Sequence, residues 1–125
     1  MRFAKLVFTF AGIWGIVVLT PLLFLAGYIG RQYPPAITHR DFYFGFLTVA
    51  LAWQVVFLII GRDPVRYRPI MIPAMLEKFP YVVSLALLYA RGELQLGQFV
   101  PAAGSDCVLG LLFLAAFVKT KAPLG

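Results

Sequence analysis

The stretch GRDPVRYRP (residues 61–69) is the densest run of charge in this chain, and the apolar segment that follows it contains Glu77 and Lys78. The run separates two long apolar segments, and a basic loop between such segments indicates how a chain is oriented in a membrane. Glu77 and Lys78 fall at a depth where lipid disfavours charge. These residues therefore decide the fold class and point to the candidate site.

The composition of the chain indicates a membrane protein. Of its 125 residues, 62% are hydrophobic and 13% are charged, and the mean hydropathy is +0.88. Soluble proteins carry about 25% charged residues, so this chain has too few to cover a surface that faces water. The excess of Lys and Arg (11 against 5 acids) is explained by basic residues at helix ends. No basic stripe with interleaved aromatic residues is present, so nucleic-acid binding is not expected.

Long, predominantly apolar segments predict an all-α polytopic membrane protein, a four-transmembrane-helix bundle in a single domain over residues 1–125. The spans are expected at about residues 6–29, 42–60, 69–90 and 98–118. We interpret the first as a span rather than a cleaved signal peptide, because its apolar run exceeds the usual core of about 7–15 residues. Within it, Ala11, Gly12 and Gly15 favour close approach of another helix, and Pro21 should bend the helix.

The distribution of basic residues predicts the orientation. Seven cations lie on one side of the expected spans and three on the other, and Lys78 lies inside the third span. By the positive-inside rule, both termini and the loop at residues 61–69 face the cytoplasm. We therefore expect a multi-pass protein of the bacterial cytoplasmic (inner) membrane, in contact with membrane lipids. The loop arginines expected to meet anionic lipid headgroups are Arg62, Arg66 and Arg68.

Polar residues of three expected helices fall at similar depths. Counted from the basic residue that ends each span on the cytoplasmic side, they lie eight to thirteen residues in. This corresponds to about 12–20 Å at about 1.5 Å per residue. Trp14 falls at the same level, and Trp53 adjoins Gln54. We therefore predict one buried layer, whose candidate ligand-binding residues are Glu77, Lys78, Asp106, Gln54, Trp53 and Trp14.

The charges of this layer need partners, because a charged side chain within a bilayer costs at least about 2.5–3.5 kcal/mol. Adjacent Glu77 and Lys78 point about 100° apart on a helix, so we expect Lys78 to pair with Asp106 rather than with Glu77. Glu77 is then expected to meet Gln54, a tryptophan of the layer or a loop arginine. Three interpretations of the layer are open. Its polar side chains fix how the helices pack, they form a ligand or ion site, or the charged ones extend to the lipid headgroups.

Other reactive side chains give weaker indications of chemistry. His39 is a single loop histidine without a second His or Cys nearby, so no metal site is expected. Cys107 has no partner for an internal disulfide and no evident base to activate it. Ser84 and Ser105 lack the spacing of a catalytic triad. We therefore predict no catalytic residue and no cofactor.

The residues GRDPVRYRPIMIPAMLEKFPY (61–81) and YFGFLTVALAWQ (43–54) resemble uncharacterised small bacterial four-span membrane proteins, DoxX-like in outline. The resemblance covers the second span, the basic loop and the start of the third span, while the first and fourth spans match in hydropathy. It implies four antiparallel helices, a glycine in the second span and an acidic residue early in the third. Here these positions are Gly45 and Glu77. The resemblance brings no established catalytic residues.

Three functions are compatible with the sequence. We favour a non-enzymatic subunit, or a stabilising or assembly factor, of a larger membrane complex with a protein partner. The alternative is binding or conversion of a hydrophobic small molecule, such as a lipid, a sterol-like molecule or a quinone, at the polar layer. Its aromatic wall is expected to comprise Trp14, Trp53, Phe79 and Tyr81. The third function is proton-coupled transport by an oligomer, with Glu77 or Asp106 as the coupled residue.

Overall fold

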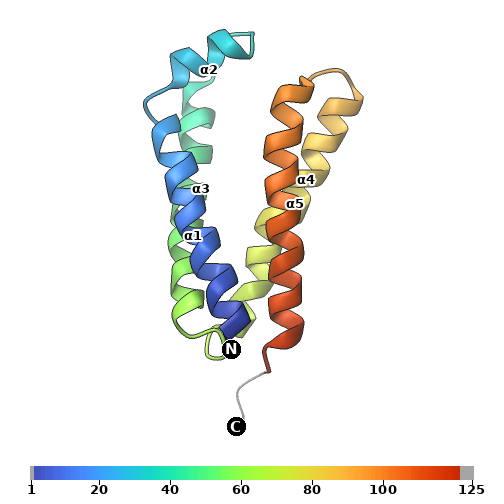
Figure 1. Cartoon of the computed structure of the whole chain (residues 1–125). Helices are drawn as coiled ribbons and strands as arrows, with labels where there is room; N and C mark the ends of the chain where they lie inside the picture. The colour runs from blue at the N-terminus through green and yellow to red at the C-terminus, as the bar shows by residue number, and fades with distance from the viewer. Residues whose placement is uncertain (1, 122–125) are drawn as a thin grey trace.

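The computed structural model describes residues 2–121, which are helical apart from turns and loops and contain no strand (Figure 1). The long helices are α1 (Arg2–Leu22), α3 (Arg40–Arg62), α4 (Met71–Ala90) and α5 (Leu96–Lys119). A short helix, α2 (Ala26–Gln32), follows α1, and a 3-10 turn, η1 (Arg68–Ile70), precedes α4. Residues 1 and 122–125 of the expected single domain lie outside the described part.

Four helical segments are long and apolar enough to cross a membrane. They are Arg2–Leu22, Arg40–Arg62, Arg68–Ala90 and Leu96–Lys119. Between 22% and 33% of the apolar window of each segment is buried inside the structure, so most of each helix surface faces outward. Such outward apolar surfaces are what lipid contact requires of a multi-pass membrane protein. The prediction of an all-α chain with four helices of this kind is confirmed.

The expected first span, residues 6–29, is divided into two helices. α1 ends at Leu22, and a turn leads into α2. Pro21 has no backbone N–H to donate and disturbs the helix around it. The hydroxyl of Tyr43 in α3 donates a hydrogen bond to the Leu22 carbonyl at 2.6 Å. This contact satisfies a carbonyl in the last turn of α1, where internal donors are missing. The bend expected at Pro21 is therefore a helix end.

The long helices form two hairpins that meet at one end (Figure 1). α1 packs along α3, and α4 packs along α5. Between the hairpins, α1 also packs against α5, whereas the backbones of α3 and α4 come close at few positions. α1 begins, α5 ends and α3 passes into α4 at the same end, which we call the basal end. The opposite end, which carries α2, is called the distal end.

Small residues let α1 and α3 approach closely, as predicted. Ala11 is fully buried. A Cβ atom added to Gly12 would lie 2.8 Å from the backbone oxygen of Gln54, and one added to Gly15 would overlap the Gln54 side chain. Because glycine has no Cβ, the two backbones can lie at this separation. The α1 surface that includes Ala11, Gly12 and Gly15 thus positions Gln54.

Gly15→Ala is expected to lower the free energy of unfolding by about 1–3 kcal/mol, because the new methyl group forces Gln54 or the α1 backbone to move. Gly45→Ala in α3 is the matched control, since no atom lies within 4 Å of a Cβ added there. Thermal unfolding in mild detergent, followed by circular dichroism, measures both variants. Equal Tm values for the two variants would contradict the close approach.

A hydrophobic core at the basal end joins the two hairpins. Phe8 of α1, Phe57 of α3 and Phe113 of α5 are all fully buried. The ring centroids of Phe8 and Phe113 are 4.3 Å apart in a stacked arrangement, and those of Phe57 and Phe113 are 4.9 Å apart with one edge toward the other ring. The buried Met71 of α4 packs into the same core. This core therefore connects all four long helices.

Arg68 fixes the basal loop to the end of α5. Its Nε donates hydrogen bonds to the carbonyls of Phe117 at 3.2 Å and Thr120 at 2.6 Å. Its guanidinium carbon also lies 3.8 Å from the centroid of the Phe117 ring. The last carbonyls of a helix lack internal donors, so Arg68 acts as a cap. Arg62 and Arg66 are exposed, and their contact with lipid headgroups stays a prediction.

Candidate ligand-binding cavity

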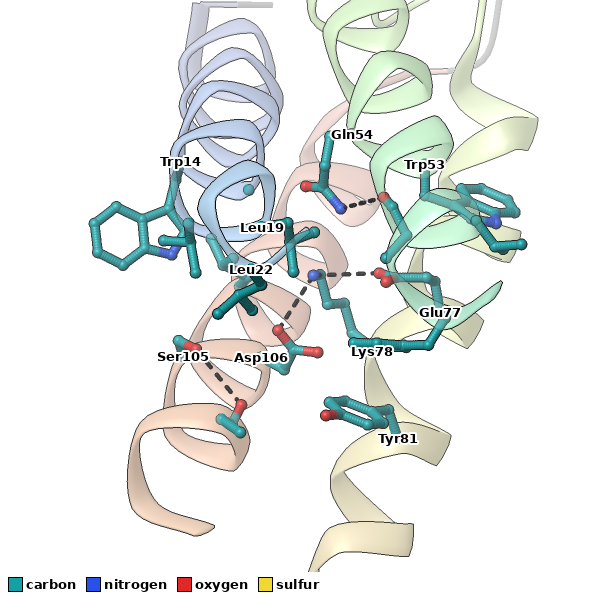
Figure 2. Close-up of a pocket in the computed structure, with 17 residues that line it drawn as sticks. Trp14, Leu19, Leu22, Trp53, Gln54, Glu77, Lys78, Tyr81, Ser105 and Asp106 are labelled. Atoms are coloured by element: carbon teal, nitrogen blue, oxygen red, sulfur yellow. Dashed lines mark hydrogen bonds and ion pairs between the residues drawn. The ribbon is translucent and has the colours of Figure 1, made fainter. Parts of the chain in front are cut away.

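A cavity of about 410 Å³ lies between the two hairpins, directly distal to the basal core (Figure 2). All four long helices contribute to its lining. α1 and α3 supply mostly apolar and aromatic side chains, whereas α4 and α5 supply the charged ones. Small-molecule sites have volumes of about 300–1,000 Å³ and combine apolar walls with a few polar groups. This cavity has both properties.

The structure brings all six candidate residues to this cavity. They come from all four long helices and are Trp14, Trp53, Gln54, Glu77, Lys78 and Asp106. Depth along the helices predicted this grouping, with Trp53 included because it adjoins Gln54. Their role in binding a ligand stays a prediction.

The ammonium group of Lys78 lies between two carboxylates (Figure 2). Its Nζ donates a hydrogen bond to Asp106 Oδ1 at 3.2 Å and lies 3.2 Å from Glu77 Oε2. Lys78 is 4% exposed, while the side chains of Glu77 and Asp106 are 19% and 18% exposed. The ammonium group is thus enclosed, and the two carboxylates form its boundary with the cavity. We call Glu77, Lys78 and Asp106 the charged triad.

The geometry of the charged triad confirms one expectation and corrects another. The predicted pair of Lys78 and Asp106 is present. The expectation that Glu77 pairs away from Lys78 is wrong, because the two side chains form an ion pair. The flexible four-carbon stem of lysine spans the angle between adjacent helix positions. Glu77 Oε2 is buried, and its contact with the Lys78 ammonium at 3.2 Å is an ion pair.

Gln54 is held by its own helix rather than by Glu77. Its side chain is buried, and Nε2 donates a hydrogen bond to the Ala50 carbonyl at 2.8 Å. Its amide packs against Gly15 of α1, where a larger residue would overlap it. Gln54, one of the alternative partners expected for Glu77, therefore donates its hydrogen bond elsewhere.

Aromatic side chains form much of the remaining wall. Trp14, Trp53 and Tyr81 line the cavity as expected, and Tyr81 stacks on Phe46 of the other hairpin with ring centroids 5.8 Å apart. The expectation that Phe79 belongs to this wall is wrong. Its ring lies instead against Gly110 of α5, where an added Cβ would be 2.9 Å away. Phe79 therefore contributes to packing within the α4–α5 hairpin.

Several lining residues were not predicted from the sequence. Phe46, Val49 and Ala50 line the cavity together with Trp53 and Gln54. Their spacing of three or four residues places them on one face of a helix, so extending that face backwards from Gln54 would have identified them. Ser105 of α5 also lines the cavity, but its hydroxyl donates to the Pro101 carbonyl at 2.7 Å.

The donor groups of the cavity suit an organic ligand better than a metal ion. Within residues 2–121, no three His, Cys, Asp or Glu side chains are placed to hold a metal. Lys78 occupies the space between the two acids, where a bound cation would otherwise lie. The cavity therefore offers carboxylate oxygens on one wall and apolar or aromatic contact on the others.

Comparison with known proteins adds no further identification. No family model matches the chain, and no match was found among curated proteins or among solved structures. The resemblance of residues 61–81 to the DoxX-like class accordingly stays a prediction. Function is therefore inferred from the cavity itself.

Proposed function

We propose that this protein binds an amphiphilic small molecule between its hairpins, with the polar end of the molecule at Glu77 and Asp106. One observation carries this proposal: the charged triad lies on the wall of a cavity of about 410 Å³. Polar residues that only fix helix packing can satisfy one another without leaving space beside them. Charged residues inside a membrane that border a cavity are instead typical of functional sites.

The rest of the lining fits the apolar part of such a molecule. Trp14, Phe46 and Val49 present large apolar surfaces and come from both helices of the first hairpin. Flat or chain-like apolar groups pack well against such walls. Lipids, sterol-like molecules and quinones are the classes with a body of this kind and a polar end.

We further place the protein in the bacterial cytoplasmic membrane, with both termini and the loop at residues 61–69 in the cytoplasm. The support is the excess of basic residues at the basal end. In this orientation the charged triad lies inside the hydrocarbon region. Water is scarce there, so an ionic or hydrogen-bonded contact with a ligand is stronger than at the surface.

Ala102→Phe is expected to fill the cavity and to lower the amount of retained small molecule about tenfold or more. Ala102 lines the cavity one turn before Asp106 and carries no charge, so the substitution leaves the charged triad in place. Ala86→Phe, at an exposed position of α4, is the matched control. Mass spectrometry of the small molecules that stay bound after purification in mild detergent measures the difference. Equal retention by both variants would contradict the cavity as the site.

A second function is favoured by the weak contact between α3 and α4. Although Phe46 and Tyr81 stack between these helices, their backbones come close at few positions, so this side of the bundle is the less closely packed one. A transmembrane helix of another protein can cover it, and the chain would then be a non-enzymatic subunit or assembly factor of a membrane complex. A protein that copurifies reproducibly, with no retained small molecule, would favour this function over the first.

A further inference from the structure

The charges on the cavity wall do not balance, and this imbalance bears on the chemical class of the ligand. Glu77, Lys78 and Asp106 are the charged residues of the lining. With both carboxylates ionised, the single ammonium group leaves one negative charge without a partner. An unpaired charge in a region of low polarity is costly. Protonation of one carboxyl relieves that cost while the cavity is empty, and a positive group delivered into the cavity relieves it when a ligand is bound.

Lys78 has no remaining capacity to neutralise the second carboxylate. Its Nζ is already 3.2 Å from an oxygen of each acid, and its side chain is enclosed. Arg68 is bound to carbonyls at the basal end of α5. Figure 2 shows the second carboxylate oxygen of Asp106 free of any marked interaction, on the side toward Tyr81. The acids therefore keep acceptor capacity that faces the cavity.

The aromatic walls of the cavity are also suited to a positively charged group. Trp14, Trp53 and Tyr81 line the cavity together with the two acids. The face of an aromatic ring attracts a cation, and rings combined with carboxylates are a common way to bind amines and quaternary ammonium groups. An anionic ligand would instead meet two carboxylates and an ammonium group that is already engaged.

We infer that the amphiphile bound in this cavity is a cation, with an amine or quaternary ammonium group at the polar end of an apolar chain or ring system. This inference rests on the proposed function and specifies its ligand. The positive group lies beside the charged triad, between the second carboxylate oxygen of Asp106 and the ring of Tyr81, because Lys78 fills the space between the two acids. The apolar part lies along Trp14 and Val49.

The two tryptophans of the chain provide the readout, because both line the cavity. The full chain is placed in nanodiscs of an uncharged galactolipid, which carries no ammonium group, and is titrated with three matched alkyl probes. Each probe carries bromine at the apolar end and either trimethylammonium, hydroxyl or carboxylate at the other. Bromine quenches tryptophan fluorescence on contact, so saturable quenching reports occupancy. We expect the trimethylammonium probe to bind about tenfold or more tightly than the hydroxyl probe.

Two variants test whether the surplus carboxylate causes this preference. Glu77→Gln and Asp106→Asn each remove one acid and leave the other paired with Lys78, so the wall becomes neutral. In each variant the preference for trimethylammonium over hydroxyl is expected to fall about tenfold, to near unity. Glu93→Gln changes an exposed acid in the turn between α4 and α5 and is the control that keeps the preference. Partition of the probes into lipid is the same for all variants and cancels in the comparison.

The outcomes separate this inference from the function on which it rests. Hydroxyl or carboxylate probes that bind as tightly as trimethylammonium would overturn the cationic ligand and leave the cavity as a binding site. A preference for trimethylammonium over hydroxyl that persists in both Glu77→Gln and Asp106→Asn would likewise overturn the cationic ligand. Absence of saturable quenching by every probe would overturn the proposed function itself. Circular dichroism of each variant verifies its fold, and the two single substitutions test the same point independently.

Discussion

Lys78→Met is expected to lower the free energy of unfolding by about 3–5 kcal/mol, the largest effect of any single substitution in the charged triad. The Lys78 ammonium lies 3.2 Å from oxygens of both Glu77 and Asp106. Its removal leaves two neighbouring carboxylates in an enclosed region without a counter-ion. Thermal and denaturant unfolding in detergent, followed by circular dichroism, measures the loss.

A control and a rescue variant distinguish this effect from loss of a lysine in general. Lys5→Met removes an exposed lysine of α1 and should change stability little. Adding Glu77→Gln and Asp106→Asn to Lys78→Met is expected to restore most of the lost stability, because no charge then remains in the layer. A Lys78→Met protein as stable as Lys5→Met would show that the ion pairs are unimportant for the fold.

Phe113→Ala is expected to destabilise the fold by about 3–5 kcal/mol. The Phe113 ring is fully buried, stacks on Phe8 of α1 and contacts Phe57 of α3. The Phe113 ring therefore packs the two hairpins together, and its truncation leaves a cavity in the core that joins them. Tm in mild detergent and resistance to proteolysis measure the effect.

Phe24→Ala is the control for this substitution, because Phe24 is 81% exposed. Its Tm should stay close to that of the unmodified chain. Because Phe8 and Phe113 are in contact, the double substitution to alanine should cost less than the sum of the two single effects. Equal Tm values for Phe113→Ala and Phe24→Ala would contradict the role of the basal core.

The helices and the shared layer could be predicted because both depend on distance along the chain. Long apolar runs locate the long helices, and the constant rise per residue places Gln54, Glu77 and Asp106 at similar depths. The pair of Lys78 with Asp106 follows from those depths, since few other partners lie within reach. The rise per residue gives depth alone, and a shared layer also requires that each helix turns these residues inward.

Rotation about each helix axis and tertiary contacts decide what the sequence could not predict. Phe79 and Tyr81 are both aromatic and close in sequence, yet Phe79 packs on Gly110 and Tyr81 lines the cavity. The break after Leu22 involves a hydroxyl twenty-one residues away, on Tyr43. The ion pair of Glu77 with its neighbour depends on the path of one flexible side chain. Each of these is set by packing in three dimensions rather than by spacing.

Trp14, Phe46 and Val49 are 44%, 45% and 59% exposed, although all three line the cavity. In a bilayer the neighbours of these side chains are acyl chains. The amphiphile that we propose as the ligand would then enter sideways, by diffusing within the leaflet, without crossing water. Its occupancy would follow its mole fraction in the surrounding lipid rather than its concentration in the buffer. A compound that is nearly insoluble in water would therefore be able to fill the cavity when it is abundant in the membrane.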